Sequence, residues 1–424
     1  MDLRTASKEE LLAFKDELTA RYKECCDKKL KLDMSRGKPG ADQLDLSEGL
    51  LTAVASNEEA VFEGTDLRNY GGLDGIPACK ALFAEILGLK PENVLIGGNA
   101  SLTMMYDNIM RLWVFGDCNG STPWSKLDKV KFLCPVPGYD RHFAICQQFG
   151  IEMINVPMNE NGPDMDLVEK LVSSDDAIKG IWCVPKYSNP TGVVYSDEVV
   201  KRFAALKPAA KDFKLMWDNA YCVHHLTDDK AKILNIFEEA AKHGNEDMIF
   251  QFASTSKVTY PGAGVACMTA SVKNMKWTKN LLKVQAIGPD KINQARHVKF
   301  FKDAAGIAAH MEKHRAILAP KFKMVLNMLE ENLGGTGAGS WISPKGGYFI
   351  SFDSMPGCAT KIYDLCKEAG VVITDAGATF PYANDPENKN LRIAPSYPPV
   401  AELKAAMEVF CVCALLAAVE KKLG

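Results

Sequence analysis

The chain of 424 residues lacks the features that mark several common classes of protein. No apolar run approaches the roughly 20 residues that a membrane-spanning helix needs. The N-terminus opens with charged residues rather than with the apolar core of a signal peptide. There is no long Lys/Arg tract, and the formal net charge of -3 argues against binding to a nucleic-acid backbone. These absences favour a globular protein of the cytoplasm.

Paired cysteines are also missing, although the chain contains 13 cysteines. They are scattered from Cys25 to Cys413, their number is odd, and none belongs to a C-x-x-C pair. This pattern argues against a disulfide framework and against a zinc knuckle. Reduced thiols in a cytosol fit it better.

The composition, 47% hydrophobic and 24% charged, is typical of a globular enzyme or binding protein. A chain of this length is too long for one ordinary core, so we expect a large domain with a smaller one. The expected division is an N-terminal segment at 1–60 that joins the small domain, a large domain at 61–302 and a small domain at 303–424. Ser7 and Glu10 have the spacing of a capping box and predict the start of the first helix.

From about residue 75 to residue 300, short β-rich runs alternate with segments of helical period. The runs are residues 93–96, 130–133, 151–156, 180–184, 215–217 and 248–252. Such alternation indicates βαβ units and a mostly parallel sheet. Because ligands of open parallel sheets bind beyond the carboxyl ends of the strands, residues that follow each run are the candidate site.

Two of these strand ends carry an amine and a carboxylate, Lys257 and Asp218. Pyridoxal 5'-phosphate (PLP) needs this combination. A lysine holds its aldehyde as a Schiff base, and a carboxylate keeps its pyridine nitrogen protonated. A lysine at a strand end is usually a solvated surface residue, so the assignment depends on its neighbours.

The other strand ends supply further groups that suit such a cofactor. Residues 97–103 lead from glycines into a helix start, whose free N–H groups suit a phosphate, although Ser101 could equally be an ordinary N-cap. Tyr139 could stack on a flat heterocycle or simply pack, and His142 lies three residues on. Asn189 and Tyr221 could both donate to a phenolic oxygen.

With these motifs in place, the chain resembles fold-type I PLP-dependent aminotransferases (class I/II) through nearly its whole length. The runs that carry the resemblance are Ser188-Asn-Pro-Thr-Gly192, Asp218-Asn-Ala-Tyr221, Ser254-Thr-Ser-Lys257 and Leu391-Arg-Ile-Ala394. Residues 261–266 and 291–297 are similar to a divergent bacterial subgroup of aspartate aminotransferases. The resemblance implies an α/β fold, with a mostly parallel seven-stranded sheet in an αβα sandwich and a smaller α+β domain. It also implies PLP-dependent transamination, most simply of aspartate to oxaloacetate with 2-oxoglutarate by a ping-pong mechanism.

The resemblance also implies roles for individual residues. Lys257 would bind the cofactor and move the substrate proton, while Asp218, backed by His142, would pair with the pyridinium. Tyr139 would stack on the ring, and Asn189 and Tyr221 would bind the phenolic oxygen. The implied phosphate contacts are Asn99, Ala100, Ser101 and Ser254. In a homodimer with shared active sites, Tyr70 would reach the partner's cofactor.

Substrate recognition is implied for Arg392, which would clamp the α-carboxylate in a bidentate fork. Gly37 resembles the family's substrate-side glycine, and Asn189 would also face the substrate. For a side-chain carboxylate, Arg36 is the first candidate and Arg296 the second. One departure concerns the phosphate: many relatives have an arginine about eight residues after the lysine, and residues 260–265 contain none. We expect another cation, which the sequence does not place.

Several alternatives remain open. The amino donor could be an aromatic amino acid, kynurenine or α-aminoadipate, and a β-elimination side activity would use the same site. Residues 254–257 also fit the S-x-x-K motif of serine acylases, but the companion motifs are incomplete. A PLP-binding transcription regulator would need a DNA-binding domain. His310 and His314 could suggest a metal hydrolase, yet without a third ligand an exposed helix is the expected interpretation, and no metal is expected.

Overall fold

The computed structural model describes residues 1–424. Its largest sheet has the strand order β4-β11-β10-β9-β8-β5-β6-β7. The neighbouring pairs from β10 to β6 are parallel, whereas β11 runs antiparallel to both β10 and β4, and β7 pairs antiparallel with β6. These strands are β4 (Val94–Ile96), β5 (Lys131–Val136), β6 (Glu152–Asn159), β7 (Gly162–Pro163), β8 (Ile178–Cys183), β9 (Lys214–Asp218), β10 (Ile249–Ser254) and β11 (Ala266–Ala270).

The expectation of a mostly parallel sheet is confirmed, and all six β-rich runs overlap strands of it. The seven strands from β4 to β6 form the body of the sheet, and the two-residue β7 adds an edge. The strand that the sequence analysis did not place is β11. Its five residues are all buried and include three small side chains, so it lacks the alternation that marks a strand and has only one β-branched residue, Thr269.

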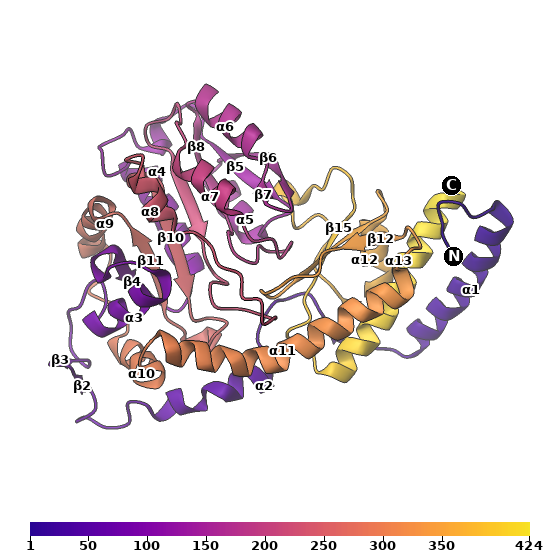
Figure 1. Cartoon of the computed structure of the whole chain (residues 1–424), viewed down its shortest axis with the longest axis horizontal. Helices are drawn as coiled ribbons and strands as arrows, with labels where there is room; N and C mark the ends of the chain where they lie inside the picture. Colours follow the sequence, from indigo (N-terminus) through magenta and orange to yellow (C-terminus); the bar gives the residue numbers. More distant parts are fainter.

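Helices cover both faces of this sheet, as the side-chain alternation along the strands requires (Figure 1). Phe250 and Phe252 of β10 point into one core, and Ile249 points into the other. The first core contains α4 (Ser101–Phe115), α5 (Asp140–Gln148) and α9 (Val272–Gln285); the second contains α6 (Met165–Ser174), α7 (Asp197–Ala204) and α8 (Ile236–Ala241). Burial of each large apolar side chain contributes about 1.5–3 kcal/mol, and the result is the expected αβα sandwich.

The remaining strands form small sheets. The order β12-β13-β15 gives a three-stranded antiparallel sheet, and β1 pairs in parallel with β14, which ties the N-terminal segment to the C-terminal part. A hairpin, β2 with β3, stands apart. The bounds are β1 (Leu32–Asp33), β2 (Val61–Phe62), β3 (Thr65–Asp66), β12 (Gly339–Trp341), β13 (Ile350–Ser354), β14 (Val371–Val372) and β15 (Asn390–Ile393).

A third core joins the two ends of the chain. In Figure 1 the first helix lies beside the last one, and both termini are at the same end of the molecule. Ser7 caps the first helix, and the capping box with Glu10 is present as expected. The helices outside the sandwich are α1 (Lys8–Asp27), α2 (Ala41–Leu44), α3 (Pro77–Leu87), α10 (Lys291–Phe301), α11 (Ala304–Leu333), α12 (Ala359–Glu368) and α13 (Val400–Leu423). None of the helices is long and apolar enough to cross a membrane.

The long helix α11 contributes to two different cores. Ile307 and Met311, near its start, pack with α3 and α10, whereas Leu318 and the residues after it pack with α1 and α13. One rigid helix therefore runs from beside the large sheet to the C-terminal core (Figure 1). The domain boundaries at residues 60 and 302 stay a prediction.

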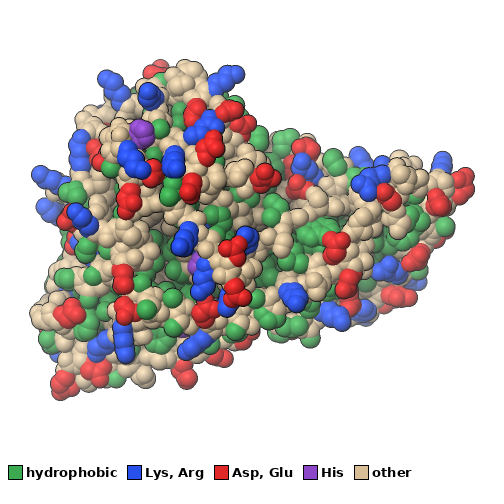
Figure 2. All heavy atoms as spheres, viewed as in Figure 1, with side chains coloured by type: hydrophobic (Ala, Val, Ile, Leu, Met, Phe, Trp, Pro, Cys, Tyr) green, Lys and Arg blue, Asp and Glu red, His purple; other side chains and the backbone are tan.

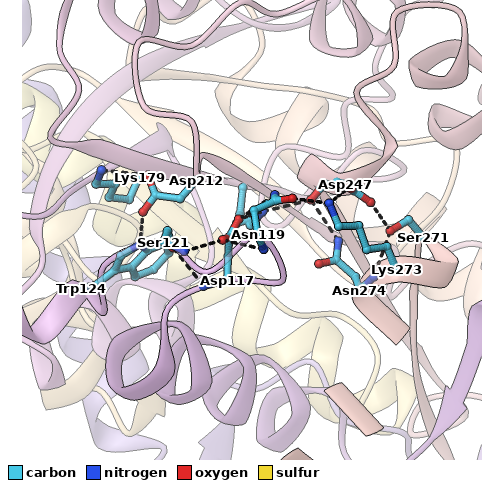
Figure 3. A network of polar contacts seen from close by, with 11 residues as sticks. Asp117, Asn119, Ser121, Trp124, Lys179, Asp212, Asp247, Ser271, Lys273 and Asn274 are labelled. Atoms are coloured by element: carbon cyan, nitrogen blue, oxygen red, sulfur yellow. Dashed lines mark hydrogen bonds and ion pairs between the residues drawn. The ribbon is translucent and has the colours of Figure 1, made fainter. Parts of the chain in front are cut away.

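The amino ends of the parallel strands are closed by polar contacts (Figure 3). Lys214 of β9 and Asp117 form an ion pair at 3.1 Å, with both side chains almost fully buried. Asp212 accepts hydrogen bonds from Lys179 at 2.8 Å and from the indole of Trp124 at 2.8 Å. The contacts at this edge of the sheet thus pair the buried charges of Lys214 and Lys179 with carboxylates. On the face in Figure 2, acidic and basic side chains are mixed, without a field of one sign.

Candidate functional site

The opposite edge of the sheet, at the carboxyl ends of the strands, opens into a cavity of about 600 Å³. The N-terminal segment and the C-terminal part close its other sides. Among the residues named from the sequence, the cavity brings together Arg36, Gly37, Ala100, Ser101, Tyr139, Asn189, Asp218, Tyr221, Ser254, Lys257 and Arg392. Asn99 and His142 lie directly behind this lining, as their contacts below show, whereas Tyr70 and Arg296 are not part of it.

Lys257 follows β10 and points its amine toward two aromatic rings. The Nζ atom lies 5.2 Å from the ring centre of Tyr221 and 6.0 Å from that of Tyr348. Burial lowers the pKa of Lys257, and the positive charge of Arg392 lowers it further, whereas the carboxylate of Asp218 raises it. A lysine with a lowered pKa spends more time as the neutral amine, which is the form that attacks an aldehyde.

Asp218 ends β9 with its carboxylate buried, at 3% exposure. One oxygen, Oδ2, lies 3.0 Å from Nε2 of His142, which is itself stacked on Trp182 with ring centres 4.3 Å apart. The other oxygen, Oδ1, is buried without any hydrogen-bond partner. A buried carboxylate oxygen that lacks a donor is costly, and Asp218 lines the cavity. The residues present therefore fit a bound group that presents an N–H here, as a pyridinium does.

The first turn of α4 lies at one end of the cavity. Ala100 is the N-cap of the helix and supplies no side-chain hydrogen bond, so Ser101 is not the N-cap that the alternative interpretation required. The hydroxyls of Ser254 and Ser256 lie 3.1 Å apart, and Ser256 also donates to the backbone oxygen of Asn99 at 2.9 Å. Free N–H groups of a helix start, together with hydroxyls, suit a phosphate.

The position eight residues after Lys257, where many relatives have an arginine, is Val265. Its side chain is buried in the core formed by α3, α10 and the start of α11. Its backbone N–H donates to the hydroxyl of Thr255 at 2.9 Å. A charged side chain would not fit this apolar position. The substitute cation for the phosphate stays a prediction.

Two tyrosines and an amide stand around the space between Lys257 and Asp218. Tyr139 is the N-cap of α5, and burial raises its pKa to about 12. Tyr221 is almost fully buried, which raises its pKa as well. Both phenols therefore stay protonated near neutral pH and can donate a hydrogen bond. Asn189 is buried and lines the same cavity.

Arg392, on β15, is held on three sides. Nη1 donates to Asp140 at 3.0 Å and to Asn189 at 3.2 Å, and Nε donates to Thr374 at 3.3 Å. The guanidinium lies over the ring of Phe349, 4.7 Å from its centre. At 8% exposure it is largely removed from water, so its attraction for a carboxylate is screened less than at the surface.

Gly37 makes this arrangement possible because it touches the ring under Arg392. A Cβ atom at position 37 would lie 2.3 Å from Cζ of Phe349. Gly37→Ala is therefore expected to push the ring away and misplace Arg392. Since a misplacement of about 1 Å can cost a hundredfold, we expect kcat/KM to fall by about 10- to 100-fold while the melting temperature changes little. Gly262, whose added Cβ would meet nothing within 4 Å and which does not line the cavity, gives the matched control Gly262→Ala. Equal activities of the two variants would contradict this role of Gly37.

A clamp of four side chains, Tyr348, His224, His310 and His314, surrounds the backbone at Lys257. The carbonyl oxygen of Lys257 lies 3.3 Å from the Tyr348 hydroxyl and 3.3 Å from Nε2 of His224. The next carbonyl, of Val258, lies 2.9 Å from Nε2 of His310. Burial lowers the pKa of His224 and of His310, so both rings stay neutral, with the proton on the nitrogen that donates. The clamp fixes the main chain from which the Lys257 side chain extends.

The expectation that His310 and His314 lie on an exposed helix is wrong. They are 4% and 1% exposed, and their Nε2 atoms lie 3.1 Å apart beneath the loop that carries Lys257. Gln43, from α2, donates to Nδ1 of His314 at 3.1 Å and to the Tyr348 hydroxyl at 2.9 Å. The sequence hid this because the partners are far away in the chain. No group of three or more His, Cys, Asp or Glu side chains is placed to hold a metal ion.

Among the cavity residues that sequence reasoning missed, four contact the predicted site residues: Asp140, Thr374, Phe349 and Ser256. Ser256 was within reach, because it directly precedes Lys257 in the motif that was singled out. Asp140 also adjoins Tyr139, but nothing local indicates that it pairs with an arginine about 250 residues later. Thr374 and Phe349 follow no strand of the large sheet, so the rule about strand ends could not find them.

The comparisons with known proteins agree with this geometry. Residues 6–424 match the family model described as aspartate amino-transferase. An aspartate aminotransferase of Corynebacterium glutamicum is 48% identical over 407 residues, which cover 96% of this chain and 94% of that protein. The crystal structure of an aspartate transaminase from C. glutamicum superposes with a TM-score of 0.96 at 46% identity, covering 100% of this chain and 99% of that one.

More distant structures share the fold. The Thermus thermophilus aspartate aminotransferase with maleate has a TM-score of 0.70 at 17% identity and covers 94% of this chain and 96% of its own. The fold expected for a fold-type I enzyme is thus confirmed. The family match confirms the PLP-dependent aminotransferase assignment. The chain belongs to the aspartate aminotransferase family of PLP-dependent enzymes.

Proposed function

We propose that this aminotransferase transfers the amino group of aspartate to 2-oxoglutarate by a ping-pong mechanism, and that it does so in the cytoplasm. The observation that carries the proposal is the 48% identity over 407 residues to the aspartate aminotransferase of C. glutamicum. At this level of similarity, extending over both proteins almost completely, a shared substrate is the simplest expectation. All 13 cysteines are free, which is compatible with a reducing compartment.

The charges of the cavity suit a substrate with two carboxylates. Arg392 would receive the α-carboxylate, and Arg36, at the mouth of the same cavity, would receive the side-chain carboxylate. Arg36 is exposed and makes no ion pair or side-chain hydrogen bond, so its guanidinium is free to bind. Lys38, the next cation along, already lies over the ring of Tyr397 at 3.8 Å.

Different residues around the cavity would attach the cofactor, transfer the substrate proton and bind the pyridinium. When bound, PLP supplies the electron sink for the reaction at the substrate Cα. Lys257 would hold it covalently and later move the proton at Cα, and Asp218 would accept the pyridinium N–H through Oδ1, which has no other partner. His142 would keep the Asp218 carboxylate in position through Oδ2.

The rest of the cofactor would be fixed by the residues that surround its ring and phosphate. Tyr139 would stack on the ring, while Asn189 and Tyr221 would donate to its phenolic oxygen. The phosphate would bind at the start of α4, with contacts from Asn99, Ala100, Ser101 and Ser254. We add Ser256 to this proposed set because it hydrogen-bonds to Ser254 and to the backbone of Asn99.

A homodimer with shared active sites is part of the proposal. Tyr70 is 82% exposed and does not line the cavity of its own subunit. Its loop is fixed from behind by Lys291, whose amine donates to the backbone oxygens of Asn69 and Tyr70. Two further exposed apolar side chains lie nearby in the sequence, Val284 in the last turn of α9 and Ile287 on the connection between α9 and α10. A residue that enters the partner's active site must be exposed and must be held by a fixed loop, and Tyr70 meets both conditions.

The proposal is tested by adding single amino acids to the purified holoenzyme and recording the loss of the visible absorption of bound PLP. Aspartate and glutamate are expected to convert it fully at the lowest concentrations, and a second substrate, 2-oxoglutarate, to restore it. Parallel lines in double-reciprocal plots would support the ping-pong order. Conversion by an aromatic amino acid or kynurenine, with none by aspartate, would refute the substrate assignment.

A second donor, 2-aminoadipate, is favoured by one observation. The 2-aminoadipate transaminase of T. thermophilus is 24% identical over 366 residues, covering 86% of this chain and 85% of that protein. This donor also has two carboxylates, so it would use Arg392 and Arg36 in the same way over a longer reach. The ratio of kcat/KM for aspartate and 2-aminoadipate separates the two.

Arg36→Gln is expected to reduce kcat/KM for aspartate about 10- to 100-fold, because a hydrogen bond to a charged group is worth about 1.5–3 kcal/mol. The value for an uncharged donor such as alanine should change less than about threefold. Arg296→Gln is the matched control, since Arg296 was the other candidate and does not line the cavity of its own subunit. Equal losses for aspartate and alanine in Arg36→Gln would remove Arg36 from this role. A selective loss in Arg296→Gln would transfer the role to Arg296 of the partner subunit.

A further inference from the structure

A carboxylate of the protein itself, Asp140, pairs with Arg392, the arginine that we propose binds the substrate carboxylate. Asp140 is the first residue of α5 and lines the cavity. Its Oδ1 atom accepts a hydrogen bond from Nη1 of Arg392 at 3.0 Å. The Arg392 side chain is 8% exposed and that of Asp140 is 34% exposed. The pair therefore lies at the boundary between the buried wall and the open cavity.

The hydrogens of Arg392 show why this contact matters. Nη1 has two hydrogens, and they are used by Asp140 and by Asn189. A bidentate fork from the two terminal nitrogens needs one hydrogen from each of them. A substrate carboxylate can therefore form that fork only if one of the two present acceptors leaves Nη1. Asn189 is almost fully buried, whereas Asp140 faces the cavity, so Asp140 is the acceptor that can leave.

After displacement from Arg392, the Asp140 carboxylate can pair with a second cation, Arg141. Nε of the neighbouring Arg141 already lies 4.0 Å from Oδ2 of Asp140. Asp140 is also in the first turn of α5, where the unpaired N–H groups of the helix start favour a negative charge. Moving from Arg392 to Arg141 thus keeps the Asp140 charge compensated, while Arg392 exchanges one carboxylate for another.

We propose that Asp140 is a built-in counter-ion of Arg392, which the substrate carboxylate displaces, and that this competition sets the affinity for carboxylate substrates. The inference rests on the proposed role of Arg392 in binding the α-carboxylate. In the empty site, Asp140 spares Arg392 from being an unpaired buried charge, which would be costly. In return, every substrate carboxylate binds more weakly than it would to a free arginine, and product leaves more readily.

Asp140→Asn in the holoenzyme tests the competition, with maleate as an unreactive dicarboxylate and acetate as a monocarboxylate probe. The asparagine keeps the size of the side chain and removes its charge. Titration calorimetry is expected to show that the dissociation constants of both probes fall by about 3- to 30-fold. Unchanged or weaker binding of both probes would overturn the proposal, because it would mean that Asp140 only positions Arg392. An unaltered visible absorption of bound PLP and an unaltered melting temperature show that the variant is folded and loaded.

The role of Arg141 is tested by a double-mutant cycle with the same probes. Arg141→Gln is expected to weaken binding two- to tenfold in the wild-type background, because the displaced Asp140 then loses its second cation. In the Asp140→Asn background the same change should have no effect. A persistent effect in that background would show that Arg141 binds the ligand directly and would overturn its part in the exchange.

The two probes also separate this inference from the proposed substrate. If the enzyme prefers a donor with one carboxylate, maleate and acetate will bind the wild type with similar affinity, yet both will still bind more tightly to Asp140→Asn. If the aspartate assignment holds and the competition does not exist, maleate will bind the wild type better than acetate, and Asp140→Asn will change neither.

Discussion

Replacing Lys257 by alanine is expected to lower kcat at least about 10⁴-fold, because the change removes both the covalent attachment of the cofactor and the group that moves the proton. Of the two lysines that line the cavity, Lys257 is the one whose amine feels the charge of Asp218, whereas the amine of Lys38 lies over the Tyr397 ring. The measurement is the single-turnover rate with aspartate, together with the protein mass after borohydride treatment. The wild type should gain the mass of the cofactor, and Lys257→Ala should not.

Lys38→Ala is the matched control for this experiment. It removes a second amine that lines the same cavity, so it separates the loss of the attachment point from the loss of positive charge. It is expected to keep the covalently bound cofactor and the mass shift. A mass shift that persists in Lys257→Ala, or disappears in Lys38→Ala, would contradict the assignment of Lys257.

The large sheet and its strand ends could be predicted because they follow from local patterns. Each buried parallel strand is a short run of β-rich residues, and the carboxyl ends of parallel strands meet at one edge. Asp218 at the end of β9 and Ser254 at the end of β10 are therefore close in space for a reason that can be read in the sequence. The cavity at that edge contains most of the residues named in advance.

The contacts between segments far apart in the chain could not be predicted in this way. The ion pair between Asp140 and Arg392, and the packing of Gly37 against Phe349, join residues hundreds of positions apart. No periodicity or turn motif encodes such pairs, because they depend on how the C-terminal part closes over the sheet. Strand β11 was missed for a different reason, since its small, fully buried residues have no alternation.

The histidines of α11 illustrate a third limit. Their spacing on one helix face was correct information, but a single sequence does not tell which face is buried. The structure turns His310 toward the backbone beside Lys257, where it serves as a hydrogen-bond donor. The sequence pattern therefore gave the spacing of the two histidines but neither their burial nor their place beside Lys257.

Asp218→Asn is the second change with a large expected effect. Oδ1 of Asp218 is buried without a partner, so the negative charge is available to a cationic N–H of the bound cofactor. An asparagine keeps the shape but not the charge. Since loss of one preorganised electrostatic partner costs about 10²- to 10³-fold in kcat, we expect a decrease of that size in single-turnover experiments. The KM for aspartate should change little, because Asp218 faces the cofactor ring and not the substrate carboxylates.

The matched control is Asp212→Asn, at the other edge of the same sheet. Asp212 is also buried, accepts hydrogen bonds from Lys179 and Trp124 (Figure 3), and does not line the cavity. This change should lower the free energy of unfolding by about 3–5 kcal/mol, because it leaves the Lys179 charge unpaired. It should nevertheless leave kcat per bound cofactor unchanged. Asp218→Asn should show the reverse, a small change in stability and a large loss of kcat, because no charge inside the protein depends on its free oxygen. If both variants lost stability and activity in parallel, Asp218 would be a structural carboxylate, and the electrostatic role proposed for it would fail.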